Sequence, residues 1–162
     1  NDIAVVYGLY KRYPDVAKYH MSCFVETEAG RNNRWCMDCS VCCKMYLLIK
    51  ASGYDPRDVG LNRNMLGEEM RDYFSLFGGS NVNTYALTGR GRDEQLFAFY
   101  LAWRNGDKSP LVEEFEKRFL DEAKGREDEL HKTFFGIQES ITMPNGIKNK
   151  VESIYKEVLS DI

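Results

Sequence analysis

Histidine is scarce in this chain, and long apolar runs are missing. Only two histidines occur among 162 residues, His20 and His131, and both are too isolated in the sequence for a Ser-His-Asp or Cys-His catalytic arrangement to be argued. No stretch approaches the roughly 20 apolar residues of a membrane span. The first 15 residues mix charged and aromatic side chains, unlike a signal peptide. These absences predict a cytoplasmic protein that does not enter a membrane.

An excess of positive charge is also missing. The chain has 22 Lys or Arg and 25 Asp or Glu, a net charge of −3, which argues against a general nucleic-acid binder. Hydrophobic residues make up 43% and aromatic residues 13%, as in a globular protein. We expect two parts, residues 1–108 and a helical appendage over 109–162, because Ser109-Pro110 is a strong helix start.

Apolar residues recur mostly at helical spacing, so the predicted fold class is mainly α. We expect helices from Asp2 to the Tyr13-Pro14 step, over 40–51, 67–77 and 93–105, from Ser109-Pro110 through Leu130, and after Asn145. In the last helix, Ile147, Val151, Ile154 and Val158 are expected to face inward. Residues 28–34 are expected to form a polar loop, and 21–27 is the best strand candidate.

Five cysteines lie within 21 positions: Cys23, Cys36, Cys39, Cys42 and Cys43. An odd number in one segment does not resemble a secreted disulfide framework. Two cysteines separated by two residues can bind one ion, and Zn²⁺ takes four thiolates in a tetrahedron. The spacing Cys23-x12-Cys36-x2-Cys39-x2-Cys42 therefore predicts a structural zinc site, because four thiolates leave no open position for catalysis.

Two neighbouring side chains and one other metal are alternatives at this site. Cys43 stands about 100° around a helix from Cys42 and is expected to be a buried, inert thiol. His20, three residues before Cys23, is a rival ligand of lower rank. Four thiolates also suit an iron–sulfur cluster, but the ferredoxin run with a following Cys-Pro is missing, so zinc is favoured.

The segments SCF and RWCMDCSVCCKMYLLIKA resemble the C-terminal metal-binding part of proteins of the PP-loop ATP pyrophosphatase superfamily. In the 7-cyano-7-deazaguanine synthases, a cysteine, a spacer and C-x2-C-x2-C hold zinc. The Trp35-Cys36 pair, the apolar helix and a later glycine-containing loop before a Glu-bearing helix are more similar to the UDP-N-acetylmuramoyl-L-alanyl-L-glutamate epimerases. The resemblance covers residues 14 to about 100, and it implies that the four cysteines are zinc ligands.

The superfamily's nucleotide-binding signature, a strand followed by SGG-x-D-S and a helix, does not occur in this sequence. The segment Phe77-Gly78-Gly79-Ser80 follows an expected helix and is interpreted as a helix-ending turn. The resemblance thus implies the C-terminal portion of a larger α/β protein, an ATP-dependent synthase, ligase or epimerase. ATP and Mg²⁺ would bind in the nucleotide-binding half, and no complete catalytic motif stands in this chain.

Arg90 and Arg92 precede the helix expected over 93–105. Because helix N-termini attract anions and arginine binds phosphate or carboxylate with two hydrogen bonds, they are candidates for binding a substrate carboxylate or a nucleotide. An ordinary loop capped by Asp93 is the competing interpretation. His131 lies on a charged face and is expected to be exposed.

Basic and aromatic residues also surround the cysteines: Arg31, Arg34, Trp35 and Lys44. Such residues can grip RNA, although nearby acidic groups dilute the charge. Two alternative functions therefore stay open, a stand-alone zinc-knuckle module that binds protein or RNA, and a tRNA-thiolation-type protein with an iron–sulfur cluster. The sequence names neither the substrate nor the oligomeric state.

Overall fold

The computed structural model describes residues 2–24, 27–137 and 143–159. Within these ranges the chain is helical and has no strand, which confirms the mainly α prediction. The α-helices are α1 (Asp2–Arg12), α2 (Pro14–Ala17), α3 (Glu28–Asn33), α4 (Ser40–Ala51), α5 (Gly89–Arg104), α6 (Pro110–Arg118), α7 (Leu120–Gly125), α8 (Glu127–Phe135) and α9 (Asn145–Leu159). Four short 3-10 segments are η1 (Pro56–Val59), η2 (Glu68–Tyr73), η3 (Ser75–Phe77) and η4 (Thr84–Leu87).

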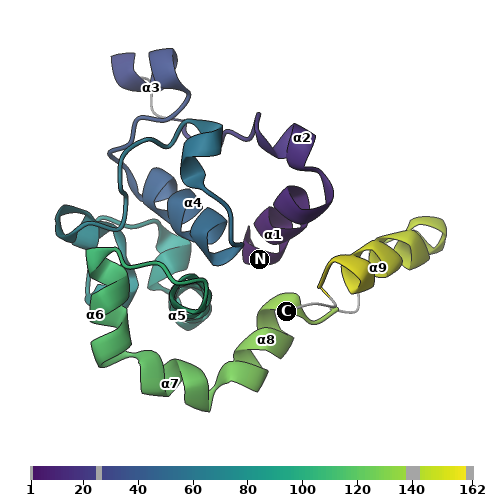
Figure 1. Ribbon diagram of the computed structural model, residues 1–162. Helices are drawn as coiled ribbons and strands as arrows, with labels where there is room; N and C mark the ends of the chain where they lie inside the picture. The colour runs from purple at the N-terminus through teal and green to yellow at the C-terminus, as the bar shows by residue number, and fades with distance from the viewer. Residues whose placement is uncertain (1, 25–26, 138–142, 160–162) are drawn as a thin grey trace.

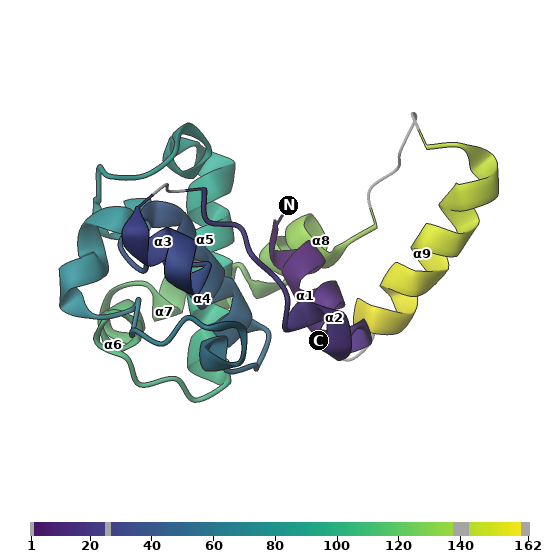
Figure 2. The ribbon, with the colours of Figure 1, turned by 90° about the horizontal axis from the view of Figure 1, so that it is seen from above.

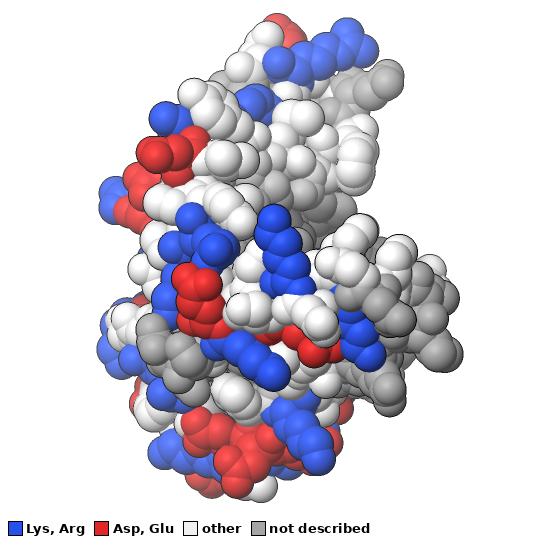
Figure 3. Space-filling view, turned by 90° about the vertical axis from the view of Figure 1, so that its right-hand side faces the viewer, with Lys and Arg blue, Asp and Glu red and all other residues white. Residues whose placement is uncertain are grey.

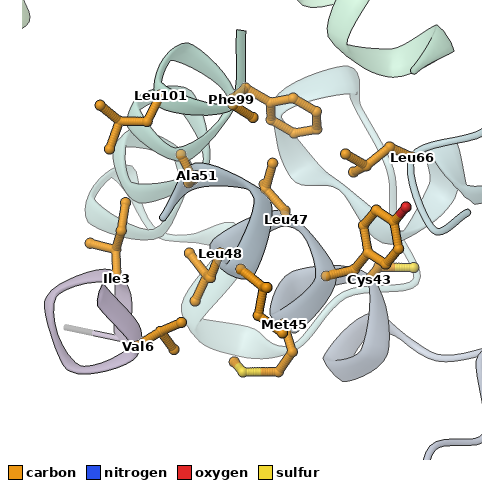
Figure 4. Close-up of a cluster of buried hydrophobic side chains, with 14 of the residues drawn as sticks. Ile3, Val6, Cys43, Met45, Leu47, Leu48, Ala51, Leu66, Phe99 and Leu101 are labelled. Atoms are coloured by element: carbon orange, nitrogen blue, oxygen red, sulfur yellow. The ribbon is translucent and has the colours of Figure 1, made fainter. Parts of the chain in front are cut away.

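Helices α4 and α5 form the centre of the molecule, and α1 packs beside α4 (Figure 1). Both central helices are apolar around most of their circumference because neighbours cover them on several sides. Figure 4 shows Leu47 and Leu48 of α4 between Phe99 of α5 and Ile3 of α1, all buried. Deleting one such leucine side chain typically costs about 2–5 kcal/mol, so this cluster supports the whole fold.

Helices α6, α7 and α8 follow one another in an arc beside α5, and α9 lies beyond α1 at the edge of the molecule (Figures 1 and 2). The boundary expected between residues 108 and 109 falls in the connection from α5 to α6. Side chains from both sides of it, such as Phe97 and Phe115, belong to one hydrophobic core. Residues 109–135 are therefore packed on the same core as the first 108.

A buried carboxylate ties α1 to the central pair. Glu94 of α5 is 2% exposed, and its Oε1 accepts the backbone N–H groups of Asp2 (2.7 Å) and Ile3 (3.2 Å). The first turn of a helix leaves such N–H groups without partners, and a carboxylate there is favourable. Lys44 of α4 lies 3.4 Å from the same carboxylate and balances its charge.

The prediction of an α-helix over 67–77 is wrong. The structure has the two 3-10 segments η2 and η3 there, separated by Phe74 in an extended conformation. The apolar stripe is nevertheless buried, and the Phe74 ring packs against Phe77 and Phe99 at 6.4 and 5.2 Å between ring centroids. Packing against α5 therefore prevails over a continuous helix in a segment whose aromatic residues have modest helix propensity.

The prediction of one continuous helix from Ser109 through Leu130 is also wrong. Phe119 and Arg126 leave helical geometry, with φ near −129° and −117°, and they divide it into α6, α7 and α8. The apolar spacing predicts an inward stripe of Val112, Phe115, Phe119, Ala123 and Leu130; Phe119 is half-buried and the other four are buried. The two bends let a single apolar stripe follow the curved surface of α5.

Smaller corrections concern the segment around the cysteines, the start of α5 and the first turn of α9. Residues 28–33 form α3 rather than a loop, because Thr27 caps it by accepting the Gly30 N–H at 3.1 Å. The described part of 21–27 is not a strand. Helix α5 begins at Gly89, before the expected start, and in α9 Ile147 is 54% exposed rather than inward. These features depend on capping hydrogen bonds and on packing neighbours, which the spacing of apolar residues does not reveal.

Candidate metal centre

The structure brings the four predicted cysteines together. The sulfur atoms of Cys23, Cys36, Cys39 and Cys42 all lie within 4.8 Å of one another, and those of Cys36 and Cys42 are 3.7 Å apart. A tetrahedral zinc site with Zn–S bonds of about 2.3 Å places its sulfurs about 3.8 Å apart. The observed separations therefore suit one ion bound by four thiols.

The start of α4 positions two of the four sulfurs. Cys39 is the N-cap residue of α4, and its Sγ accepts the backbone N–H of Cys42 at 3.5 Å. Cys42 is buried in the first turn of the same helix. A cap and a residue three positions later meet on one side of a helix start, which explains why C-x2-C at this point makes half of a site.

The backbone on the other side of the site is strained. Arg34 and Met37 have φ values of 64° and 55°, a left-handed conformation that costs non-glycine residues about 1–3 kcal/mol. Hydrogen bonds from side chains hold both turns. Arg34 donates to the carbonyl oxygen of Val59 at 3.2 Å, and Arg63 donates to that of Met37 at 3.2 Å. These two turns, fixed by the hydrogen bonds, direct the chain so that Cys36 and Cys39 approach the same point.

The thiols of the site are linked by hydrogen bonds. The pKa of Cys39 falls to about 5, first because the Cys42 thiol donates to it and then because backbone N–H groups of Cys42 and Val41 point at its sulfur, against the effect of burial. The pKa of Cys42 rises because it donates this hydrogen bond and is buried. Burial raises the pKa of Cys36 to about 11. A divalent cation replaces the protons that such a group of thiols otherwise shares.

The cysteine segment is anchored to the helical core by Trp35. This side chain is fully buried, and its Nε1 donates to the carbonyl oxygen of Val59 at 2.8 Å. On the other side of the cysteine segment, Tyr73 of η2 donates to the carbonyl oxygen of Asp38 at 3.3 Å. The site is therefore held from two elements that stand later in the chain.

Cys43 and His20 lie outside the group of four sulfurs. Cys43 is fully buried in the core, as expected, and burial raises the pKa of its thiol. The two ring nitrogens of His20 lie 2.8 Å from Ser22 Oγ and 3.4 Å from Tyr10 Oη. His20 also packs edge-on against Trp35, so it supports the anchor of the site.

Arg90 and Arg92 lie in the first turn of α5, whereas the sequence pattern predicts that they lie in a loop just before that helix. Arg92 forms two hydrogen bonds with the carboxylate of Glu122, at 2.7 and 2.9 Å, and Arg90 lies over the ring of Phe134. Packing requires glycine at position 91, because an added Cβ would stand 2.0 Å from the backbone oxygen of Tyr85. Anion binding by the two arginines stays a prediction, and Arg92 would exchange Glu122 for the ligand.

The basic and aromatic candidates around the cysteines have different surroundings. Trp35 is buried, and Lys44 is held by Asp2 and Glu94. Arg34 is on the surface, where its guanidinium donates to two backbone carbonyl oxygens. Sequence patterns did not single out Tyr19 and Phe24, which are exposed in the segment that contains Cys23.

Comparisons with protein-family models, with curated proteins and with solved structures found no match for this chain. In the part of the chain that the structure describes, no helix has both the length and the apolar surface needed to cross a bilayer.

Proposed function

We propose that the four thiols bind one Zn²⁺ and that the ion has a structural role. The observation that carries this proposal is the mutual approach of the four sulfurs to within 4.8 Å, with no position left for a substrate once four thiolates are bound. In an iron–sulfur cluster the cysteines bind several iron atoms and are spread around it, so these separations favour a single ion.

The zinc would stabilise a segment that buries little by itself. Between α2 and α4, Cys23 and Trp35 are the described apolar side chains that are buried. A bound ion supplies folding free energy that so small a cluster lacks, as structural zinc does in other small modules. The strained turns at Arg34 and Met37 are explained as the backbone cost of bringing the thiolates to one point.

The test is metal content with a matched control. The purified chain is expected to contain one zinc per molecule by emission spectroscopy and to be colourless. Cys39→Ser is expected to lose the metal and to melt at a lower temperature. Cys43→Ala removes a neighbouring buried thiol outside the site, and it is expected to keep the metal. A brown protein, or a Cys39→Ser variant with unchanged zinc and melting temperature, would refute the structural-zinc proposal.

At the level of the whole protein, we propose that this zinc-stabilised region serves a PP-loop-like, ATP-dependent adenylating enzyme and helps close its substrate site. The support is the resemblance of the cysteine run and of the apolar helix α4 to that superfamily. The test is the open reading frame that encodes this chain: an SGG-x-D-S segment encoded with it, and ATP binding by the complete product, are expected. A complete product without such a segment and without ATP binding would leave the stand-alone zinc module as the better proposal.

A further inference from the structure

Exposed apolar side chains are concentrated in the segment that leads from α2 to the metal centre. Ten large hydrophobic residues are exposed in the described part of the chain, and half of them stand between positions 13 and 24. We call this set the aromatic stripe: Tyr13, Val16, Tyr19, Met21 and Phe24, with exposed fractions from 47% to 87%. Large apolar side chains that are exposed together along one short segment mark it as a candidate binding surface.

The backbone places the stripe on one side of the molecule. The Val16 N–H donates to the carbonyl oxygen of Tyr13, and the Tyr19 N–H donates to that of Val16, both at 2.9 Å. Residues joined by successive i to i+3 hydrogen bonds lie one above the other. Ala17 is buried on the opposite side, so the three exposed side chains face outward.

The metal centre holds the second half of the stripe. After α2 the chain runs through Tyr19 to Cys23, whose side chain is buried and belongs to the sulfur group. Phe24 follows directly and is 87% exposed, the highest fraction among the large hydrophobic residues described as exposed. An aromatic ring next to a fixed ligand is thus presented to solvent without a covering partner in the described chain.

Cations accompany the exposed tyrosines. Arg12, which forms an ion pair with Glu157 at 2.6 Å, lies over the Tyr13 ring at 5.8 Å, and Lys18 lies over the Tyr19 ring at 5.2 Å. Arg34 reaches the backbone of Lys18, with 3.3 Å between its Nη1 and the carbonyl oxygen. In the described ranges neither Lys18 nor Arg34 forms an ion pair, so their charge is not neutralised by a carboxylate.

The charge of this region differs from that of the chain as a whole. Residues 10–36 contain five Lys or Arg and three Asp or Glu, whereas the whole chain is net negative. Figure 3 shows the face that carries α2 and α9, where uncharged surface in the upper half lies among charged side chains, most of them Lys and Arg. Asp and Glu side chains also lie at the top, at the left edge and in the middle of that view, and they are densest at its lower end. The stripe therefore combines exposed rings with local positive charge.

We propose that the aromatic stripe binds single-stranded nucleic acid. Unpaired bases stack on exposed aromatic rings, and Lys or Arg beside the rings contacts the phosphates. The rings of Tyr19 and Phe24 receive bases, and Lys18 and Arg34 contact the backbone. A duplex binds weakly, because its base faces are covered by neighbouring bases. This site uses neither Trp35 nor Lys44.

The experiment uses the full, metal-loaded chain and fluorescein-labelled probes: oligouridine and oligothymidine of about 12 nucleotides, and a duplex of the same length. Fluorescence anisotropy at about 50 mM salt is expected to show binding of at least one single strand, more tightly than of the duplex. The two single strands distinguish RNA from DNA as the natural ligand. Binding is expected to weaken steeply when the salt is raised to about 200 mM.

Variants assign the binding to the stripe. Tyr19→Ser and Phe24→Ser are each expected to raise the dissociation constant at least about fivefold, the loss of one stacked base. Lys18→Gln is expected to reduce the salt dependence by about one unit of slope. Leu87→Ser removes an apolar side chain on η4 that is 63% exposed, close to the 69% of Tyr19, and it is the control, with unchanged affinity. Zinc content is measured for each variant, which separates failure of this proposal from failure of the structural-zinc proposal.

Three results would overturn it: no binding of either single strand by a zinc-loaded chain, equal binding of single strand and duplex, or equal loss in Leu87→Ser. Sedimentation supplies a further check. If the chain binds no oligonucleotide but forms a dimer that Tyr19→Ser dissociates, the stripe is an interface between copies, and the nucleic-acid proposal is wrong.

Discussion

The indole Nε1 of Trp35 donates a hydrogen bond of 2.8 Å to the carbonyl oxygen of Val59. This contact joins the residue before Cys36 to the end of η1, and it lies inside the hydrophobic core, where both residues are fully buried. Because the cysteine segment itself buries few apolar groups, the Trp35 side chain is its main anchor to the hydrophobic core. Its loss should therefore affect both stability and metal retention.

Replacing Trp35 with Phe is expected to lower the free energy of unfolding by about 1–3 kcal/mol. The smaller ring leaves a cavity and deprives the Val59 carbonyl of its indole donor. Urea unfolding of the zinc-loaded chain, followed by circular dichroism, measures the change. Trp103→Phe is the matched control, since Trp103 is half-buried at the end of α5, and it is expected to cost less. Equal costs for the two variants would show that Trp35 has no special role.

Removing the metal is expected to loosen the cysteine segment before the core. The described residues 18–24 and 27–39 depend on the sulfur group and on Trp35, whereas α4 and α5 are buried against several helices. Hydrogen exchange with and without a chelator is the measurement. Amides of α3 and of 35–39 should lose protection after chelation, while those in the middle of α5 keep it. Uniform loss throughout the chain would instead mean that the metal supports the whole fold.

The pH dependence of stability is expected to contain a contribution from Asp107. Its carboxylate is 3.0 Å from Lys50 Nζ and accepts the Ser109 N–H at 2.8 Å. Burial opposes ionisation, but the hydrogen bonds from Ser109 and the ion pair with Lys50 prevail and lower the pKa of Asp107. A carboxyl whose pKa is lower in the folded chain stabilises it fully above its unfolded value near 4, and this stabilisation is lost as the pH falls through the folded value.

Asp107→Asn should therefore be less stable than the parent chain at pH 7, by about 1–3 kcal/mol, and the difference should shrink as the pH falls below about 4. Denaturant unfolding at a series of pH values measures it. Asp121→Asn changes an exposed carboxylate on α7 in the same way, and its effect should be small at every pH. A constant difference for Asp107→Asn over the acid range contradicts the proposed ionisation.

His131→Phe is expected to stabilise the protein by about 1 kcal/mol. The sequence predicts an exposed histidine, but the structure buries its Nε2, which has no hydrogen-bond partner in the part of the chain described. The ring packs edge-on against Phe97 and Phe135, so a phenyl ring suits the site and removes the cost of an unpaired polar atom. Thermal melting measures the gain.

His20→Phe is the contrasting variant for that measurement. Both nitrogens of His20 lie within reach of hydroxyl groups, those of Ser22 and Tyr10, so the same substitution there should destabilise the chain. If His131→Phe also lowers the melting temperature, its buried nitrogen has a functional partner such as an ordered water, and the prediction is wrong.

Features encoded within a few neighbouring residues were predicted well. The helix over 40–51 has the expected bounds, and its first turn carries Cys42 next to the capping Cys39. The helix start at Pro110 was likewise signalled by Ser109-Pro110. Such features depend on caps, prolines and covalent spacing, which the sequence displays directly.

Features that depend on distant packing were predicted poorly. Apolar spacing alone could not distinguish a continuous helix over 67–77 from two 3-10 segments bent around Phe74. Similarly, the stripe of Phe115, Ala123 and Leu130 was recognised, but the bends at Phe119 and Arg126 were not. The shape of α5 decides these bends, and that shape arises only when the elements pack together.

The sequence by itself determined the helical class of the protein and the four cysteines that meet, because thiols two residues apart can bind one ion whatever surrounds them. Only the tertiary structure decided which aromatic residues near that site face solvent. Trp35 is buried by Val59 and His20, while Tyr19 and Phe24 stay exposed. Exposure depends on what the rest of the chain places over a side chain, and no short stretch of sequence contains that information.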